Sequence, residues 1–167
     1  MSWARAAYRS RQFFGALRAQ VGEEERLEVA AHLTPAEQAL FYSMELRDQR
    51  HGLDTLGILR AGGERDPSLL AAALLHDVGK GRIRLWHRVA FVLLKAASPP
   101  LLCRLAAGDG PGWRGAFARS LDHAERGAAL AEAAGSTAET ARLIRLHREP
   151  PGDDVPLARL QAADDAS

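Results

Sequence analysis

The stretch AALLHDVGKGR, residues 72–82, places His76 directly before Asp77 and Lys80 three residues after Asp77. Neutral imidazole and carboxylate are the side chains that most readily hold a divalent metal of borderline hardness. Adjacent residues deliver both ligand types from one point of the backbone. A His-Asp pair alone is a weak motif that arises often by chance, so the rest of the chain decides its meaning.

The surroundings of this pair predict a helix. Asp66 is a suitable N-cap and Pro67 a suitable first residue, so we expect an apolar helix over residues 67–78 that stops near Gly79. His76 and Asp77 would then lie in its last turn, where a carboxylate opposes the helix dipole unless a cation compensates it. The alternative interpretation is a pair on the surface at the end of a helix.

The whole chain is expected to be helical, because apolar residues recur at helical spacing and alternating β-branched runs are absent. A capping box of Thr34 and Glu37 predicts one long helix that runs to Ala61. Two segments are expected to be loops, residues 22–25 and 108–115. Further helices are predicted over residues 85–94, over a shorter stretch after Pro100 that ends near residue 107, and over residues 113–120. Three more are predicted toward the end of the chain: one from a cap at Asp122 to Gly135, one from a cap at Ser136 to Pro150, and one from Pro156 onward.

Composition limits the class of protein. The length of 167 residues suits a single domain, and the net charge of +1 makes bulk nucleic acid an unsuitable partner. The single cysteine, Cys103, excludes an internal disulfide and fits a reducing compartment, so a cytoplasmic location is expected. No apolar run reaches the roughly 18 residues that a transmembrane helix needs.

The first 20 residues carry four arginines and no acid. We interpret residues 1–33 as an N-terminal helical extension. Its basic helix either packs on the domain, makes a peripheral contact with a surface, or serves as a transit peptide.

Four of the six histidines are placed where helices can bring them together, as in the metal sites of helical bundles: His51, His76, His123 and His147. A short link between the predicted helices brings His51 within reach of His76. A single histidine on a helix is more often a surface or hydrogen-bonded residue than a ligand. His32 and His87 fall outside the pattern and are interpreted as structural or surface residues.

The order of these residues, His51, then His76 with Asp77, then a late Asp164, resembles the HD-domain metal-dependent phosphohydrolases over residues 34–167. In the two-metal members, segments like HAERGAALAEAAG and LIRLHRE carry two more histidines, which correspond here to His123 and His147. The resemblance implies an all-α HD-domain helical bundle with six metal ligands.

Two branches of this family differ in their ligands. The six-residue layout is similar to that of the HD-type symmetrical diadenosine tetraphosphatases. The HD-GYP cyclic-di-GMP phosphodiesterases have a second histidine where this chain has Arg148, and an acid where it has Arg47. A third metal and cyclic-di-GMP are therefore not expected.

The resemblance implies two groups of ligands that share Asp77. One metal would be held by His51, His76, Asp77 and Asp164, and the other by Asp77, His123 and His147. An imidazole-rich set favours Fe or Mn over Mg or Ca. Two such cations about 3.5 to 4 Å apart can share a hydroxide that attacks a phosphoryl group. Lys80 and Arg148 are the expected phosphate-binding residues, with Arg82 or Arg84 as further candidates. The expected catalytic residues are Asp77 and Lys80.

The predicted function is hydrolysis of a phosphoester or phosphoanhydride in a small nucleotide-like substrate. The alternative is an HD-type module that senses a nucleotide without turnover. Four aromatic residues, Trp86, Phe91, Trp113 and Phe117, would line a base-stacking pocket or belong to the core. Asp54 and Asp122 would orient ligands, although Asp122 also suits a helix cap.

Overall fold

The computed structural model of the chain describes residues 21–81, 83, 85–106, 110 and 112–167, and all regular structure within them is helical. The predicted all-α fold is confirmed. The predictions for residues 1–20 and for Arg82 and Arg84 lie outside the described residues. Within the described part, no helix combines the length and apolarity that a membrane crossing demands. The helices are α2 (Glu23–His32), α3 (Pro35–Ser43), α4 (Leu46–Ala61), α5 (Pro67–Leu75), the 3₁₀ turn η2 (Val78–Lys80), α6 (Leu85–Ala97), α7 (Pro99–Leu105), α8 (Trp113–Ala133), α9 (Ala138–Leu146) and α10 (Val155–Ala166).

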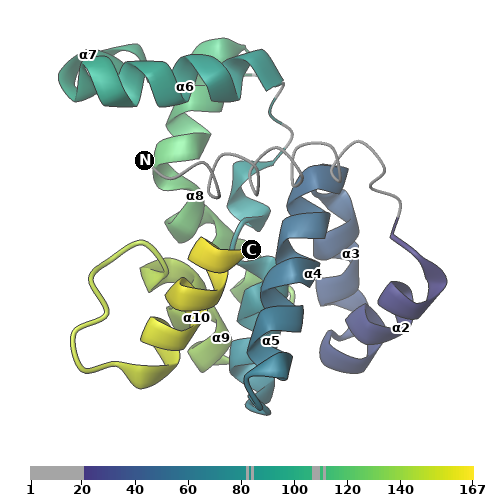
Figure 1. The fold of residues 1–167 in the computed structure, drawn as a ribbon. Coiled ribbons are helices and arrows are strands. Elements are labelled where there is room, and N and C mark those ends of the chain that lie inside the picture. Colours follow the sequence, from purple (N-terminus) through teal and green to yellow (C-terminus); the bar gives the residue numbers. More distant parts are fainter. Residues whose placement is uncertain (1–20, 82, 84, 107–109, 111) are drawn as a thin grey trace, which may run out of the picture.

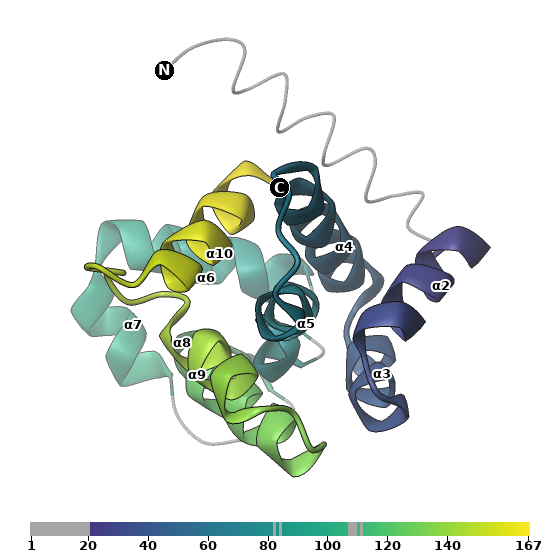
Figure 2. The same cartoon turned by 90° about the horizontal axis from the view of Figure 1, so that it is seen from below.

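Helix α5 forms the centre of the bundle. Its carboxylate cap, Asp66, accepts hydrogen bonds from Ser68 N at 2.8 Å and Leu69 N at 3.3 Å, as predicted. Every residue from Leu69 to Leu75 is buried. A helix that is apolar on all sides must be surrounded by other elements. Figure 2 shows α5 end-on between α4, α9, α10 and the pair α2–α3, which all contact it.

The predicted long helix up to Ala61 is wrong, because it is divided into α3 and α4. Met44 adopts an extended conformation with φ −68° and ψ 161°, which interrupts the helix. The side chain of Gln49 stabilises the break by donating from Nε2 to Met44 O at 2.9 Å. The capping box at the start of α3 is confirmed, since Thr34 N donates to Glu37 at 2.8 Å and Thr34 Oγ1 accepts from Glu37 N. Helix α4, which carries His51, thus packs independently of α3 against α5 and α10.

The predicted acidic loop at residues 22–25 is also wrong, because α2 begins at Glu23. Glu25 closes the first turn of the helix by accepting a hydrogen bond from Gly22 N at 2.8 Å. Three acids in this first turn suit the positive end of the helix dipole. Val29 is completely buried in the core that α2 shares with α5.

Helix α8 is one continuous helix where two were predicted. Asp122 is therefore an exposed residue in its middle and not a cap. Gly135, with φ +86°, ends α8 as predicted. The cap of α9 is Thr137, whose hydroxyl accepts from Thr140 N at 3.0 Å. Ser136, the predicted cap, donates instead to Glu37 at 2.5 Å. A tertiary contact thus takes Ser136 away from the helix end.

Helix α5 ends three residues earlier than predicted, and η2 follows it. His76 is the C-cap of α5 and Asp77 precedes η2. The turn η2 lies directly on α8: a Cβ atom on Gly79 would be 2.0 Å from His123 O and 2.6 Å from Gly127 N. Only glycine permits this approach, which brings the His76-Asp77 pair beside His123.

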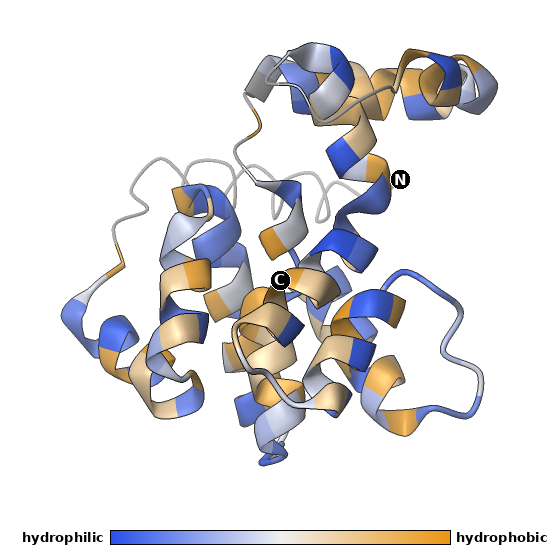
Figure 3. Ribbon diagram, turned by 180° about the vertical axis from the view of Figure 1, so that it is seen from behind, coloured by the Kyte–Doolittle hydropathy of each residue, from blue (hydrophilic) through white to orange (hydrophobic). Residues whose placement is uncertain are grey.

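Helices α6 and α7 lie across one end of the bundle, apart from its central core (Figure 1). Helix α6 is anchored to α8 by an aromatic contact, since the ring of Phe91 lies 6.1 Å from that of Phe117. Phe117 also contacts Trp113 of its own helix at 5.5 Å, and α7 packs on both α6 and α8. Hydrophobic residues recur at intervals along the helices of the molecule (Figure 3), as amphipathic packing requires. Several apolar side chains of α6 and α7 remain exposed: Trp86, Val89, Val92, Leu93 and Leu101.

Candidate metal centre

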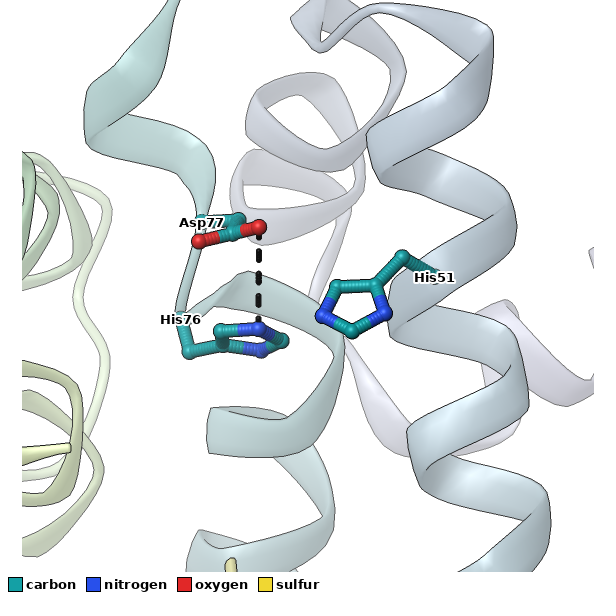
Figure 4. Close-up of side chains that lie close together, drawn as sticks. All are labelled: His51, His76 and Asp77. Carbon is teal, nitrogen blue, oxygen red and sulfur yellow. Dashed lines mark ion pairs between the residues drawn. The ribbon is translucent and has the colours of Figure 1, made fainter. Parts of the chain in front are cut away.

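The structure brings all six predicted ligand residues together from five segments of the chain. His51 comes from α4, the His76-Asp77 pair from the junction of α5 and η2, His123 from α8, His147 from the end of α9, and Asp164 from α10. Two triads each have their ligand atoms within 4.8 Å of one another: His51, His76 and Asp77, and Asp77, His123 and His147. Asp77 belongs to both. Figure 4 shows the first triad, with the His51 ring beside the His76-Asp77 pair.

Asp164 completes the first group. Its Oδ1 atom lies 2.7 Å from His51 Nε2 and 3.4 Å from His76 Nε2. Helix α10 is held against α4 and α5 by buried side chains of Leu157, Leu160 and Ala163. The carboxylate therefore reaches the site from a packed helix.

Three of the histidines are oriented by the backbone in the same way. The Nδ1 atoms of His76, His123 and His147 lie 3.0, 3.0 and 2.7 Å from the carbonyl oxygen of the residue three positions earlier. A carbonyl can only accept, so each Nδ1 carries the proton and donates it. In the neutral rings, this assignment leaves each Nε2 with its lone pair directed into the site, as in metal-binding histidines whose other nitrogen is held by a hydrogen bond.

The fourth histidine, His51, is oriented by a side chain. Its Nδ1 atom lies 2.8 Å from Ser167 Oγ. The Ser167 hydroxyl donates its own proton to Asp164 O at 2.9 Å, so it accepts from His51 Nδ1. The Nε2 atom of His51 is then left facing the Asp164 carboxylate, and the two atoms need a proton or a metal ion between them.

The Nε2 atoms of His123 and His147 lie 3.2 Å apart in the interior. Burial lowers the pKa of His123 to about 3 and that of His147 to about 4, so both rings are neutral at neutral pH. With both Nδ1 protons used by carbonyls, two lone pairs face each other. In the same cluster, His76 Nε2 is buried and accepts or donates no hydrogen bond among the described residues. These nitrogens fit a bound cation, because buried polar atoms otherwise have partners.

The two carboxylates are ionised in spite of their burial. Burial raises the pKa of Asp77, but Lys80 and the surrounding histidines outweigh it and hold the pKa well below its usual value. Burial likewise raises the pKa of Asp164, and the neighbouring His51 and His76 lower it further than burial raises it. Four imidazole nitrogens and two carboxylates form a donor set that suits divalent transition metals. The residues present therefore fit a site for such ions.

Lys80 and Arg148 lie at the mouth of this site. Lys80 Nζ donates to Asp77 Oδ2, and the Lys80 side chain is 23 % exposed. A cavity of about 460 Å³ adjoins the cluster and is lined by residues that include Asp77, Lys80, His123, His147, Arg148 and Asp164. Solvent and a small ligand thus have access to both carboxylates.

The remaining predicted residues lie outside the cluster. Asp54 is near Arg50, at 3.9 Å. His32 lies 3.8 Å from Glu28, and the buried ring of His87 packs on Trp86. Asp122 is exposed on α8, as described above.

Sequence reasoning missed the groups that orient the ligands, which are Ser167 and the three backbone carbonyls. The carbonyls follow one rule that the sequence does contain: each belongs to the residue three positions before a site histidine on a helix. The Ser167 contact spans 116 positions and leaves no such local signal.

The chain matches the family model described as HD domain over residues 27–166. No curated protein and no solved structure matches it.

Proposed function

We propose that this chain, which belongs to the HD domain family, is a metal-dependent hydrolase. It would cleave phosphoester or phosphoanhydride bonds in a small organic phosphate of about the size of a nucleotide. One observation carries the proposal: the Nε2 atoms of four histidines converge with two ionised carboxylates, and His76 Nε2 makes no hydrogen bond among the described residues. Such a site loses stability unless cations compensate its lone pairs and negative charges.

The residues divide into two sets around Asp77. His51, His76 and Asp164 would hold one ion with Asp77, and His123 and His147 would hold a second with the same carboxylate. Fe or Mn suits this ligand set best. When bound, the ions supply Lewis-acid activation of water and of a phosphoryl group.

The cavity lining favours water as the attacking group. Among the described residues that line the cavity beside the metal centre, none carries a hydroxyl or thiol side chain. Asp77 serves as a shared ligand in this proposal, because its carboxylate belongs to both triads.

Lys80 and Arg148 would bind the substrate. The Lys80 ammonium pairs with Asp77 in the protein alone, and the same charge can bind a phosphoryl oxygen once cations neutralise that carboxylate. Arg148 is exposed at the rim of the cavity, where its guanidinium can hold a second anionic oxygen.

Elemental analysis combined with a phosphate-release screen tests the proposal. Purified protein should contain Fe, Mn or a related ion, and should release phosphate from at least one substrate in a panel of nucleotides, dinucleoside polyphosphates and simple organic phosphates. Chelation and the Asp77→Asn variant should both abolish this release. Tight metal and nucleotide binding without turnover of any substrate would instead identify a sensing module.

A further inference from the structure

A second cavity of about 400 Å³ adjoins the metal centre. Its lining shares Lys80 and Arg148 with the cavity that contains Asp77, His123 and His147. A ligand whose phosphate lies at the metal centre can therefore extend past these two residues into the second cavity. Helix α6 forms much of its wall.

Part of the lining of the second cavity is cationic. Arg88 pairs with the buried carboxylate of Asp48, and Lys80 pairs with Asp77. Arg47 and Arg148 are exposed, and neither has a carboxylate within 4.0 Å in the part of the chain that the structure describes. These two guanidinium groups remain available to an anionic ligand.

A second part of the lining is apolar. It consists of Ile83 and the α6 residues Val89, Phe91, Val92 and Leu93. Four aromatic residues were predicted either to line a base-stacking pocket or to belong to the core, and only Phe91 of these four lines this cavity. Trp86 is 55 % exposed, and the buried Phe117 contacts Trp113.

Apart from its cationic side chains, the described lining offers almost no groups for reading a nucleobase by hydrogen bonds. Ser120 is its single uncharged polar side chain, and the Ser120 hydroxyl already donates to Ala116 O at 2.8 Å. The apolar part of the lining has no hydrogen-bonding side chain and suits an apolar group, since base edges would lose their bonds to water there.

We propose that the second cavity binds the organic part of the substrate, and that this part is an apolar alkyl or aryl group attached to the phosphate. Arg148, which lines both cavities, holds the anionic oxygens at their junction, Arg47 supplies a second guanidinium within the second cavity, and Val89 and Val92 contact the apolar group. This inference rests on the proposed phosphohydrolase function and narrows its substrate class.

Phosphonates test the inference because their phosphorus–carbon bond is not hydrolysed. Binding of methylphosphonate, n-hexylphosphonate and a nucleoside 5′-phosphonate to the metal-loaded protein is measured by calorimetry. We expect n-hexylphosphonate to bind at least tenfold more tightly than methylphosphonate. A tenfold gain corresponds to about 1.4 kcal/mol, which burial of about two methylene groups supplies.

The double variant Val89→Gln/Val92→Gln should lose this tenfold gain and keep its affinity for methylphosphonate. Both valines are more than half exposed, so the changes leave the core intact. Leu130→Gln is the matched control, because Leu130 is exposed on α8 and lines neither cavity. It should bind all three compounds like the unchanged protein.

Two results would overturn the inference. Equal affinities for the methyl and hexyl compounds would show that no apolar group is bound in the second cavity. Tighter binding of the nucleoside phosphonate, unaffected by the double variant, would assign the site to a nucleotide. Failure of all three compounds to bind metal-loaded protein would contradict the proposed function as well, so the two failures are distinguishable.

Discussion

His123 Nε2 and His147 Nε2 lie 3.2 Å apart, although they come from different helices and are separated by 24 positions in the chain. Each ring is held in place by a hydrogen bond from its Nδ1 to a backbone carbonyl. The two lone pairs therefore cannot turn away from each other without breaking these bonds. A cation bound between the two nitrogens removes the repulsion of their lone pairs. We therefore expect metal content to depend on the residues of this cluster.

Replacement of Asp77 should affect both metal sites, because its carboxylate belongs to both triads. We expect Asp77→Ala to lose both ions and His123→Ala to lose mainly one, as measured by elemental analysis per chain. Unchanged metal content in Asp77→Ala would disprove the shared role of this carboxylate.

Asp164 and Asp165 provide a matched pair. Asp164 Oδ1 contacts His51 and His76, whereas the neighbouring Asp165 is exposed. Asp164→Asn should lose one ion and the hydrolase activity, because an amide is a poorer metal ligand than a carboxylate. Asp165→Asn should retain both. The reverse result would mean that the last ligand has been assigned to the wrong residue.

Lys80 should act on substrate and not on metal content. Lys80→Ala removes one charge-assisted hydrogen bond to phosphate, so kcat/KM should fall about tenfold to a hundredfold while both ions remain. Lys95, the other lysine of the chain, is exposed on α6 and provides the control. Kinetics of Lys80→Ala that equal those of Lys95→Ala would exclude a role in substrate binding.

Gly79 should tolerate no side chain. A Cβ atom there would lie 2.0 Å from His123 O, so Gly79→Ala must push η2 away from α8. We expect a loss of about 2–3 kcal/mol in the free energy of unfolding, together with weaker metal binding. Gly57→Ala is the control: its Cβ meets no atom within 4 Å, and alanine in a helix interior should stabilise α4 by about 0.5–1 kcal/mol. Denaturant titration measures both effects, and equal stabilities would contradict the close packing of η2.

The metal-free protein should lose stability below pH 6.5. The pKa values of His123 and His147 fall from 6.5 to about 3 and about 4 on folding, so the unfolded chain binds more protons in this range. The contribution of these two histidines to stability is complete above pH 6.5 and decreases toward pH 4, by up to about 1.4 kcal/mol per pH unit for each histidine. The raised pKa of His76 has the opposite effect only above pH 6.5, and so does not offset this loss.

Denaturant titration in the presence of a chelator measures this pH dependence. His123→Gln should show a smaller slope, because one of the two buried histidines no longer takes up a proton on unfolding. A free energy of unfolding that stays constant between pH 6.5 and pH 4 would contradict the neutral, buried state of both rings.

Local contacts explain what the sequence predicts correctly. The caps at Thr34 and Asp66 and the end of α8 at Gly135 depend on residues within about four positions, so their residue types indicate them directly. The apolar pattern predicts an all-α chain for the same reason. The break at Met44 was missed because it combines a buried apolar side chain with a hydrogen bond from Gln49. The sequence presents both residues as ordinary helix positions.

By itself, the sequence determined the helical class and the order of the six candidate ligands, since both follow from residue types along the chain. Only the tertiary structure decided which atoms of those residues meet. The meeting of His123 Nε2 with His147 Nε2, the Ser167 contact to His51 and the approach of Asp164 to His76 depend on how η2, α8, α9 and α10 pack around α5. These contacts join residues up to 116 positions apart. Their geometry is set by the close approach at Gly79 and by burial, neither of which is encoded in any short segment.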